Sequence, residues 1–205
     1  MAAPARQRIL DAALALIQQQ GIGRVTTKEI ASRAGAAEGS LFKNFGDKMG
    51  LLAELLTYEL PENRAWREVP QIAPPQRGQL VPALVLGMER AIDFFAAALP
   101  LVAGSFADRE LLRRHQELNR QRHSGPQLAI DATATYIASW QKAGYLDSRV
   151  DSYAMALSLC GSALMYAYTQ HLAGSESLRC ERDTLIDAVI RTIVGPHMSE
   201  PVPPD

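Results

Sequence analysis

Apolar residues recur at helical spacing along almost the whole chain, and this pattern restricts the fold more than any other feature of the sequence. Residues at positions i, i+3, i+4 and i+7 lie on one face of an α-helix, whereas a half-buried strand needs strict alternation. The sequence has no pair of alternating β-branched runs joined by an Asn-Gly or Asp-Gly turn. We therefore expect an all-α protein of about nine helices.

Glycine, proline and capping residues predict where these helices begin and end. Four helices are expected in the first 60 residues. The first covers residues 5–20, and the second runs from Thr26 or Thr27 to Gly35. The third is short and carries Leu41, Phe42 and Phe45, and the fourth is capped by Asp47 and ended by Pro61. Five more are expected over residues 79–99, 107–122, 126–142, 151–172 and 182–194. Pro100 should end the first of these five, because proline has no backbone N–H and its ring clashes with the preceding turn.

Composition changes divide the chain into a head and a body. Five proline and glycine residues fall within residues 61–78, which predicts an irregular connector. The connector separates a head over residues 1–48, whose fourth helix bridges to about residue 60, from a body over residues 79–197. The proline-rich tail over residues 198–205 is predicted to be disordered.

The head is basic although the whole chain is not. Residues 1–48 contain seven Lys and Arg residues and four Asp and Glu residues, a net charge of +3. The whole chain has a net charge of −1, so the remainder carries −4. A small basic module on an acidic body is typical of a DNA-binding segment joined to a part with another task.

Other classes of protein fit the sequence less well. Ser152 to Gln170 has no charge over 19 positions, but its five Ser, Thr and Gln residues and its lack of a basic flank favour a buried helix over a membrane span. Two cysteines and an N-terminus without a long apolar run predict a cytoplasmic protein. The sequence has no Gly-rich phosphate loop, nucleophile elbow or HExxH motif, so we expect no catalytic residue, metal or cofactor.

The most informative segment runs from Thr26 to Leu52. It reads TTKEIASRAGAAEGSLFKNFGDKMGLL, which predicts two short helices around a turn that contains Gly35, followed by a longer helix. These are the parts of a helix-turn-helix, in which the first helix crosses the phosphate backbone and the second lies in the major groove. Glycine suits the turn because it readily adopts a left-handed backbone conformation.

This segment resembles the tetracycline-repressor (TetR-type) family of regulators. The matching positions are Thr27, Ile30-Ala31, Ala34-Gly35, Gly39-Ser40-Leu41-Phe42, Phe45, Lys48 and Leu51-Leu52. A looser family-like stretch covers residues 140–146 of the body. The resemblance implies a dimeric transcriptional repressor whose body binds a small apolar or amphipathic inducer and whose two heads bind a palindromic operator of double-stranded DNA.

We expect DNA contacts from both short helices and from the start of the fourth helix. The expected DNA-binding residues are Thr27, Lys28, Glu38, Gly39, Ser40, Phe42, Lys43, Asn44 and Lys48. Lys43 is expected to reach a guanine edge or phosphate, and Lys48 to pair with phosphate.

The segment also differs from the family pattern at three places. Ala36-Ala37 replaces a hydroxyl residue that caps the recognition helix, and Phe42 replaces a tyrosine whose hydroxyl reaches phosphate. Glu38 brings a negative charge to the helix start, which repels phosphate unless the carboxylate accepts a hydrogen bond from a cytosine amino group.

The body contains candidates for a ligand pocket and for a dimer interface. The candidate ligand-binding residues are Met88, Phe95, His115, Asn119, Tyr136, Trp140 and Tyr166, for each of which core packing or a surface position is the alternative. The homodimer is expected to form through the helices near residues 151–172 and 182–194. The residues that suggest it are Ala154, Ser158 and Gly161 on the first helix and Ile186, Val189, Ile190 and Ile193 on the second. Two such pairs would make a four-helix bundle.

Our leading interpretation is therefore a ligand-responsive repressor without enzymatic activity. The alternatives are a helical interaction module whose head does not bind DNA and, with less support, an enzyme.

Overall fold

The computed structural model describes residues 4–55, 78–106, 109–122 and 125–198. Most of the expected connector and of the expected tail lies outside these ranges. The described residues belong to two compact units: unit 1 within Met1–Asn63 and Ala97–Gly125, and unit 2 within Arg64–Ala96 and Pro126–Asp205. Residues 97–125, which the sequence assigned to the body, therefore cluster with the head.

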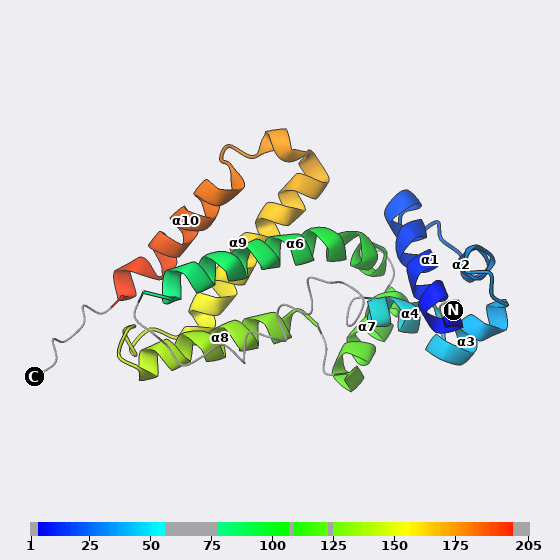
Figure 1. Ribbon diagram of the computed structural model, residues 1–205, viewed down its shortest axis with the longest axis horizontal. Helices are drawn as coiled ribbons and strands as arrows, with labels where there is room; N and C mark the ends of the chain where they lie inside the picture. The colour runs from blue at the N-terminus through cyan, green and yellow to red at the C-terminus, as the bar shows by residue number, and fades with distance from the viewer. Residues whose placement is uncertain (1–3, 56–77, 107–108, 123–124, 199–205) are drawn as a thin grey trace, which may run out of the picture. The chain divides into compact units, whose positions relative to one another are not determined.

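The all-α prediction is confirmed within the described ranges, which contain nine α-helices and two short 3₁₀ helices (Figure 1). Unit 1 contains α1 (Ala5–Gln20), α2 (Thr27–Arg33), α3 (Glu38–Phe45), α4 (Lys48–Glu54) and α7 (Arg109–Arg122). Unit 2 contains α8 (Gln127–Lys142), α9 (Ser152–Ala173), η3 (Ser175–Ser177), α10 (Arg182–Ile193) and η4 (Gly195–His197). Helix α6 (Leu80–Phe106) contributes residues to both.

The core of unit 1 is formed by the apolar stripe of α1 and its partners. The fully buried large side chains here include Ile9, Leu10, Ile17, Ile30, Leu41, Leu51, Leu52 and Leu55. Helix α1 packs against α2 and α3, and α4 packs against α3 and α7. Gly21, with a φ of 78°, ends α1 as predicted.

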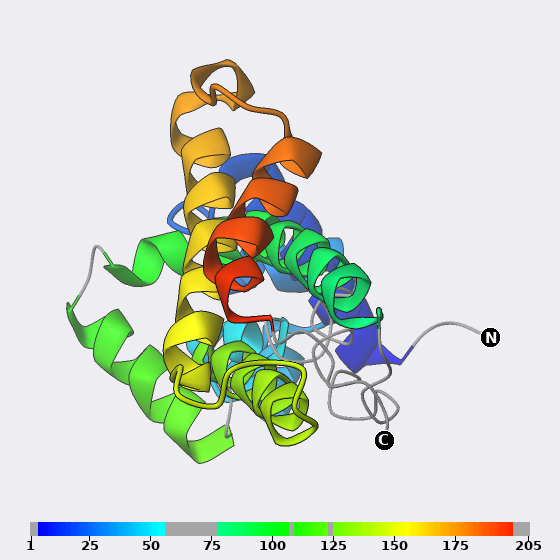
Figure 2. The same cartoon turned by 90° about the vertical axis from the view of Figure 1, so that its left-hand side faces the viewer.

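Unit 2 is built on the packing of α8 against α9. Ile137 and Trp140 of α8 and Ala156 of α9 are all at most 2% exposed, and the small residue lets the two helices approach closely. Helix α10 also packs against α9, and the two helices lie side by side in Figure 2. Arg182 at the start of α10 donates to the Asp93 carboxylate (2.8 Å) and to the carbonyl of Glu89 (2.6 Å), and so ties α10 to α6.

One predicted boundary is wrong. Helix α6 does not end before Pro100 but continues through it to Phe106. A proline inside a helix removes one backbone hydrogen bond and strains the preceding turn. Ala98 and Leu101 on either side of it are buried, and this burial offsets the loss.

The uncharged stretch of α9 forms a helix packed in unit 2, as the sequence suggested. Among the described helices, none combines the length and the apolar character needed to cross a lipid bilayer.

Gly50, in the first turn of α4, lies against the last turn of α3. A side chain at this position would begin well inside van der Waals contact with the carbonyl oxygen of Phe45 and 3.1 Å from its carbonyl carbon. Because both groups belong to the backbone, neither can rotate away. The contact therefore requires glycine.

We predict that Gly50→Ala lowers the free energy of unfolding by about 1–3 kcal/mol, the usual effect of overpacking. Gly23→Ala is the matched control, because a Cβ there meets nothing within 4 Å and the change leaves stability the same or slightly higher. Urea unfolding followed by circular dichroism measures both variants. Equal stability of the two variants would show that the Gly50 contact is not a constraint.

Candidate nucleic-acid interface

The N-terminus of α2 is fixed by a capping box. Thr26 Oγ1 accepts a hydrogen bond from the backbone N–H of Glu29 (3.2 Å), and Glu29 Oε2 accepts one from the backbone N–H of Thr26 (2.8 Å). The hydrogen bonds from Thr26 lower the pKa of Glu29, so its carboxylate is charged at neutral pH. Thr26 is therefore the cap, and the side chain of Thr27 is available for another partner.

The turn between α2 and α3 is held by α1. Gly35 has a φ of 59°, the left-handed conformation for which the sequence predicted a glycine. Arg8 of α1 donates from Nε to the carbonyl of Ala34 (2.9 Å). This hydrogen bond joins residues 26 positions apart and fixes the turn on the first helix.

Two side chains anchor α3, and the other six residues stay at the surface. Leu41 and Phe45 are buried, and so are Ile30 and Ala34 of the preceding segment, so all four belong to the core of unit 1. Ser40 is half-buried, and the exposed residues of α3 are Glu38, Gly39, Phe42, Lys43 and Asn44. Phe42 keeps 47% of its surface exposed, so its ring is presented to solvent rather than packed in the core.

The start of α3 has no side-chain cap, because Ala37 occupies the N-cap position. A different contact is made there: Thr27 Oγ1 donates to Glu38 Oε1 over 2.6 Å. The hydroxyl of Thr27, one of the expected DNA-binding residues, is thus engaged by the carboxylate at the start of the recognition helix. Further along α3, the Asn44 side chain donates to the carbonyl of Ser40 (2.7 Å).

Lys48 supports the loop between α1 and α2. Its Nζ donates to the carbonyl of Ile22 (2.7 Å) and to that of Val25 (2.5 Å). Burial lowers the pKa of Lys48, and the nearby Glu29 carboxylate opposes that shift. An ammonium group has three donor hydrogens, so one is left for a phosphate after these two contacts.

Arg6, like Arg8 and Lys48, makes contacts within unit 1. It forms an ion pair with Glu54 of α4, and its guanidinium carbon lies 5.6 Å from the centre of the Phe45 ring, within cation–π range. Arg6, Arg8 and Lys48 were counted in the basic head, yet all three hold unit 1 together. The charge available to DNA is therefore smaller than the composition suggests.

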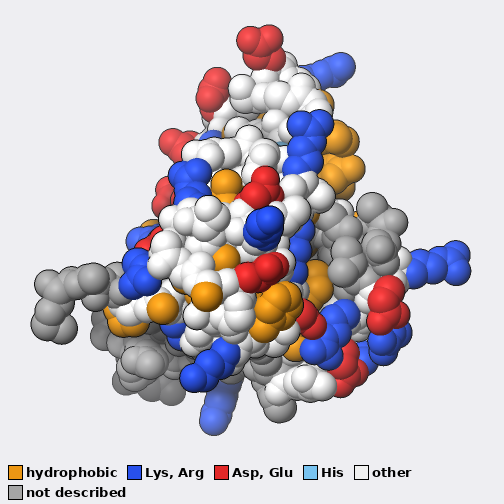
Figure 3. Space-filling model, turned by 90° about the vertical axis from the view of Figure 1, so that its right-hand side faces the viewer, with side chains coloured by type: hydrophobic (Ala, Val, Ile, Leu, Met, Phe, Trp, Pro, Cys, Tyr) orange, Lys and Arg blue, Asp and Glu red, His pale blue; other side chains and the backbone are white. Residues whose placement is uncertain are grey.

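Arg33 of α2 also makes an internal contact, to Gln19, whereas the two lysines of α2 and α3 are placed differently. Lys28 and Lys43 are exposed and form no hydrogen bond or ion pair with the described residues. Figure 3 views the side on which α1–α3 lie in Figure 1, and basic side chains there are interspersed with acidic ones. The surface thus offers individual cations rather than one continuous basic patch.

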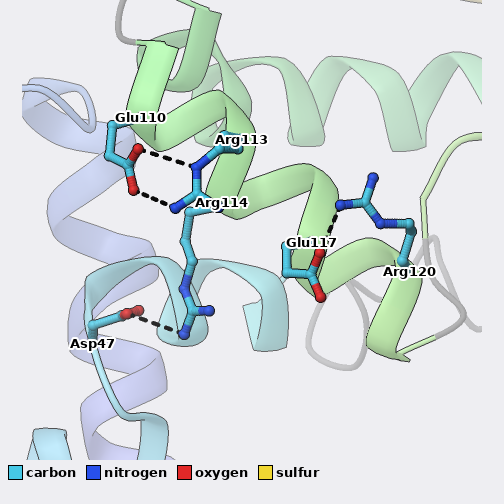
Figure 4. A network of polar contacts seen from close by, with 6 residues as sticks. All are labelled: Asp47, Glu110, Arg113, Arg114, Glu117 and Arg120. Atoms are coloured by element: carbon cyan, nitrogen blue, oxygen red, sulfur yellow. Dashed lines mark hydrogen bonds and ion pairs between the residues drawn. The ribbon is translucent and has the colours of Figure 1, made fainter.

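Helix α7 contacts Asp47, the N-cap residue of α4. Asp47 caps α4 by accepting from the N–H of Gly50 (2.7 Å), and its second oxygen lies 3.5 Å from Arg114 of α7 (Figure 4). Exposed pairs within α7 extend this network: Arg113 with Glu110 and Arg120 with Glu117. One carboxylate therefore connects α7 with the start of α4.

Sequence reasoning missed two residues that position the interface. The first is Gly50, which lies against the carbonyl of Phe45 and so joins α3 and α4. In the sequence, only the presence of a glycine in the first turn of a predicted helix could have indicated this contact. Arg8 was read as part of the basic head, and no local pattern indicates its carbonyl partner.

A short helix joined through a glycine turn to a second helix with an exposed face is the arrangement of a helix-turn-helix, a motif that many regulators use to bind DNA. Residues 9–55 match the family model of bacterial regulatory proteins of the tetR family. The HTH-type transcriptional repressor KstR of Rhodococcus jostii is 33% identical over 123 residues, which cover 53% of this chain and 58% of the relative. Matches to the curated relatives span from about a quarter to three fifths of their length.

The fold resembles solved structures over nearly its whole length. The SmeT–triclosan complex has a TM-score of 0.68 at 21% identity, and the match covers 98% of this chain and 99% of that one. The regulator FadR of Bacillus subtilis with stearoyl-CoA has a TM-score of 0.66 at 17% identity, over 92% and 97% of the two chains. Residues 9–55 therefore form a helix-turn-helix segment that matches the tetR family, and the curated relatives that match the chain are named as HTH-type transcriptional regulators or repressors.

The structure divides the seven candidate ligand-binding residues between the two units. Unit 2 contains Met88 and Phe95 of α6, Tyr136 and Trp140 of α8, and Tyr166 of α9; unit 1 contains His115 and Asn119 of α7. Burial lowers the pKa of His115. A surface hollow at the turn between α8 and α9 is lined by other residues, among them Gln141, Asp147 and His197.

Proposed function

We propose that this chain is a ligand-responsive transcriptional repressor, which a small apolar or amphipathic molecule releases from a palindromic operator. The observation that carries the proposal is the exposed face of α3, supported on two buried side chains within a segment that matches the tetR family. The repressor role is supported by the relative KstR, which is named a transcriptional repressor.

DNA binding is proposed through α2, α3 and the start of α4. The exposed Lys28 and Lys43 supply phosphate or guanine contacts, and the third donor of Lys48 supplies another phosphate contact. Gly39 carries no side chain where the helix approaches the groove, and a Cβ there would meet nothing within the chain.

We predict that Lys43→Ala reduces the salt dependence of DNA binding by about 0.9 in log–log slope, because one counterion fewer is released. Lys142→Ala, which removes an exposed charge from α8 in unit 2, leaves the slope unchanged. Fluorescence anisotropy at several salt concentrations, on an operator selected from random duplexes, measures both. Failure of the full chain to select any sequence would contradict the DNA-binding proposal.

A homodimer through α9 and α10 is supported by an exposed apolar stripe on α9. Its large members are Tyr153, Leu157, Leu164, Met165, Tyr168 and Leu172, each between 39% and 71% exposed. The spacing of 157, 161, 164, 168 and 172 repeats along one helix face, as in a helix–helix seam. On α10, Ile186 and Ile190 are buried within their own chain, whereas Val189 and Ile193 are half-buried, so only part of this stripe is left for a partner.

We predict that Leu164→Glu separates the dimer into monomers, because a buried unpaired carboxylate is strongly unfavourable. Leu128→Glu makes the same change at an exposed leucine of α8 and leaves the dimer intact. Sedimentation velocity at micromolar concentration distinguishes the two species. A wild-type chain that sediments only as a monomer would refute the interface.

The effector proposal rests on the aromatic interior of unit 2. Phe95, Trp140 and Tyr166 are at most 7% exposed, and Trp140 stacks edge-on with Tyr136 and Tyr145. The buried indole N–H of Trp140 has no hydrogen bond of good geometry with the described residues, and the Tyr136 side chain is near enough for Trp140 to affect its pKa. An amphipathic ligand with an acceptor atom would satisfy this N–H. Triclosan and stearoyl-CoA, bound by SmeT and by Bacillus subtilis FadR, combine such features.

Thermal-shift screening of acceptor-bearing amphipathic molecules, starting with these two, tests this part. We predict that at least one stabilising compound weakens operator binding by about 5- to 150-fold, the usual range of allosteric coupling. Trp140→Phe keeps a smaller aromatic ring and removes the donor, and it should weaken binding of that compound. Equal operator affinity with and without every stabilising compound would exclude ligand release.

A further inference from the structure

We infer that Glu38 determines DNA specificity by accepting a hydrogen bond from the amino group of one cytosine in each half-site, and that Thr27 is its positioning residue. The inference rests on the proposed DNA binding and adds the base that the recognition helix reads. Its starting observation is the 2.6 Å hydrogen bond from Thr27 Oγ1 to Glu38 Oε1.

The position of Glu38 places it where a helix-turn-helix reads bases. Glu38 is the first residue of α3 and is exposed, and the first residues of a recognition helix are those that contact base edges. The preceding residue, Ala37, supplies no polar side chain. Glu38 is therefore the first polar side chain that this helix presents to the groove.

Thr27 restricts where the carboxylate can point. The two residues open two different helices and are eleven positions apart, so their hydrogen bond ties the start of α3 to the start of α2. A freely rotating glutamate would lose side-chain entropy on contacting a base. With Oε1 already held, this loss occurs in folding, and Oε2 keeps its acceptor sites.

The chemistry of the carboxylate selects cytosine among the four bases. A charged carboxylate only accepts hydrogen bonds. In the major groove cytosine presents an amino donor, guanine presents two acceptors, and thymine presents an acceptor and a methyl group. Adenine presents its amino group beside the N7 acceptor, which repels a second acceptor. Glu38 therefore weakens binding to every base at its position except cytosine.

A purely structural role for the Thr27–Glu38 pair predicts a different result. If the pair only braced α2 against α3, changing it would weaken binding to all sequences alike. If Glu38 reads cytosine, the change alters base preference at one position and leaves the others intact. Base preference is thus the deciding measurement.

The experiment selects binding sites from a library of random DNA duplexes with the full-length chain and three variants. Glu38→Gln keeps an amide oxygen for the Thr27 hydroxyl but removes the charge and gains a donor. Thr27→Val keeps the size of the side chain and removes the hydroxyl. Asp11→Asn, on the exposed surface of α1, is the control for loss of one negative charge from the head. Thermal unfolding confirms that each variant is folded.

We expect the wild-type chain to select one fixed cytosine in each half-site, and its replacement by another base to lower affinity roughly 5- to 150-fold. Glu38→Gln should lose this preference, or exchange it for adenine, which glutamine reads. Thr27→Val should reduce the cytosine preference, and Asp11→Asn should select the wild-type sequence.

Two results would overturn the inference while leaving the proposed function standing: a wild-type site without a fixed cytosine, or a Glu38→Gln variant that selects the wild-type base at every position. A wild-type chain that selects no sequence would overturn the proposed DNA binding, and this inference with it.

Discussion

The backbone contact between Gly50 and the carbonyl of Phe45 is the constraint on which the interface depends. It lets α4 begin directly against the end of α3, so the recognition helix needs only Leu41 and Phe45 as buried anchors. Six of its eight residues then remain at the surface for DNA. A recognition helix held by more side chains would have fewer left to read bases, because each anchoring residue is removed from the exposed face.

Positive charge in unit 1 is divided between folding and binding. Arg8 and Lys48 donate to backbone carbonyls of the turn and loop, and Arg6 pairs with Glu54. These contacts satisfy polar groups that a small helical unit cannot pair within its helices. The long-range attraction of DNA then depends on fewer cations, such as Lys28 and Lys43. In the function proposed for this chain, specific contacts on α3 would then carry more of the discrimination between DNA sequences.

Asp47 contacts both α4 and α7 of unit 1. One oxygen caps α4, and the other lies 3.5 Å from Arg114 of α7. A ligand that favours a different placement of α7 would change this cap. Such a ligand can shift the population of DNA-competent chains only as far as its affinities for the competent and the incompetent arrangement differ. The exposed ion pairs along α7 contribute little to stability.

The sequence by itself determined the helices and the core of the interface. Apolar spacing and the stop signal at Gly21 act within a few residues, so the ends of α1 and the burial of Leu41 and Phe45 followed from local pattern. The turn motif likewise indicated the TetR type. Only the tertiary structure decided that α6 continues through Pro100, that Lys48 serves two carbonyls, and that Thr27 holds Glu38. These outcomes depend on burial or on contacts between residues more than ten positions apart, and no local pattern records which distant atoms meet.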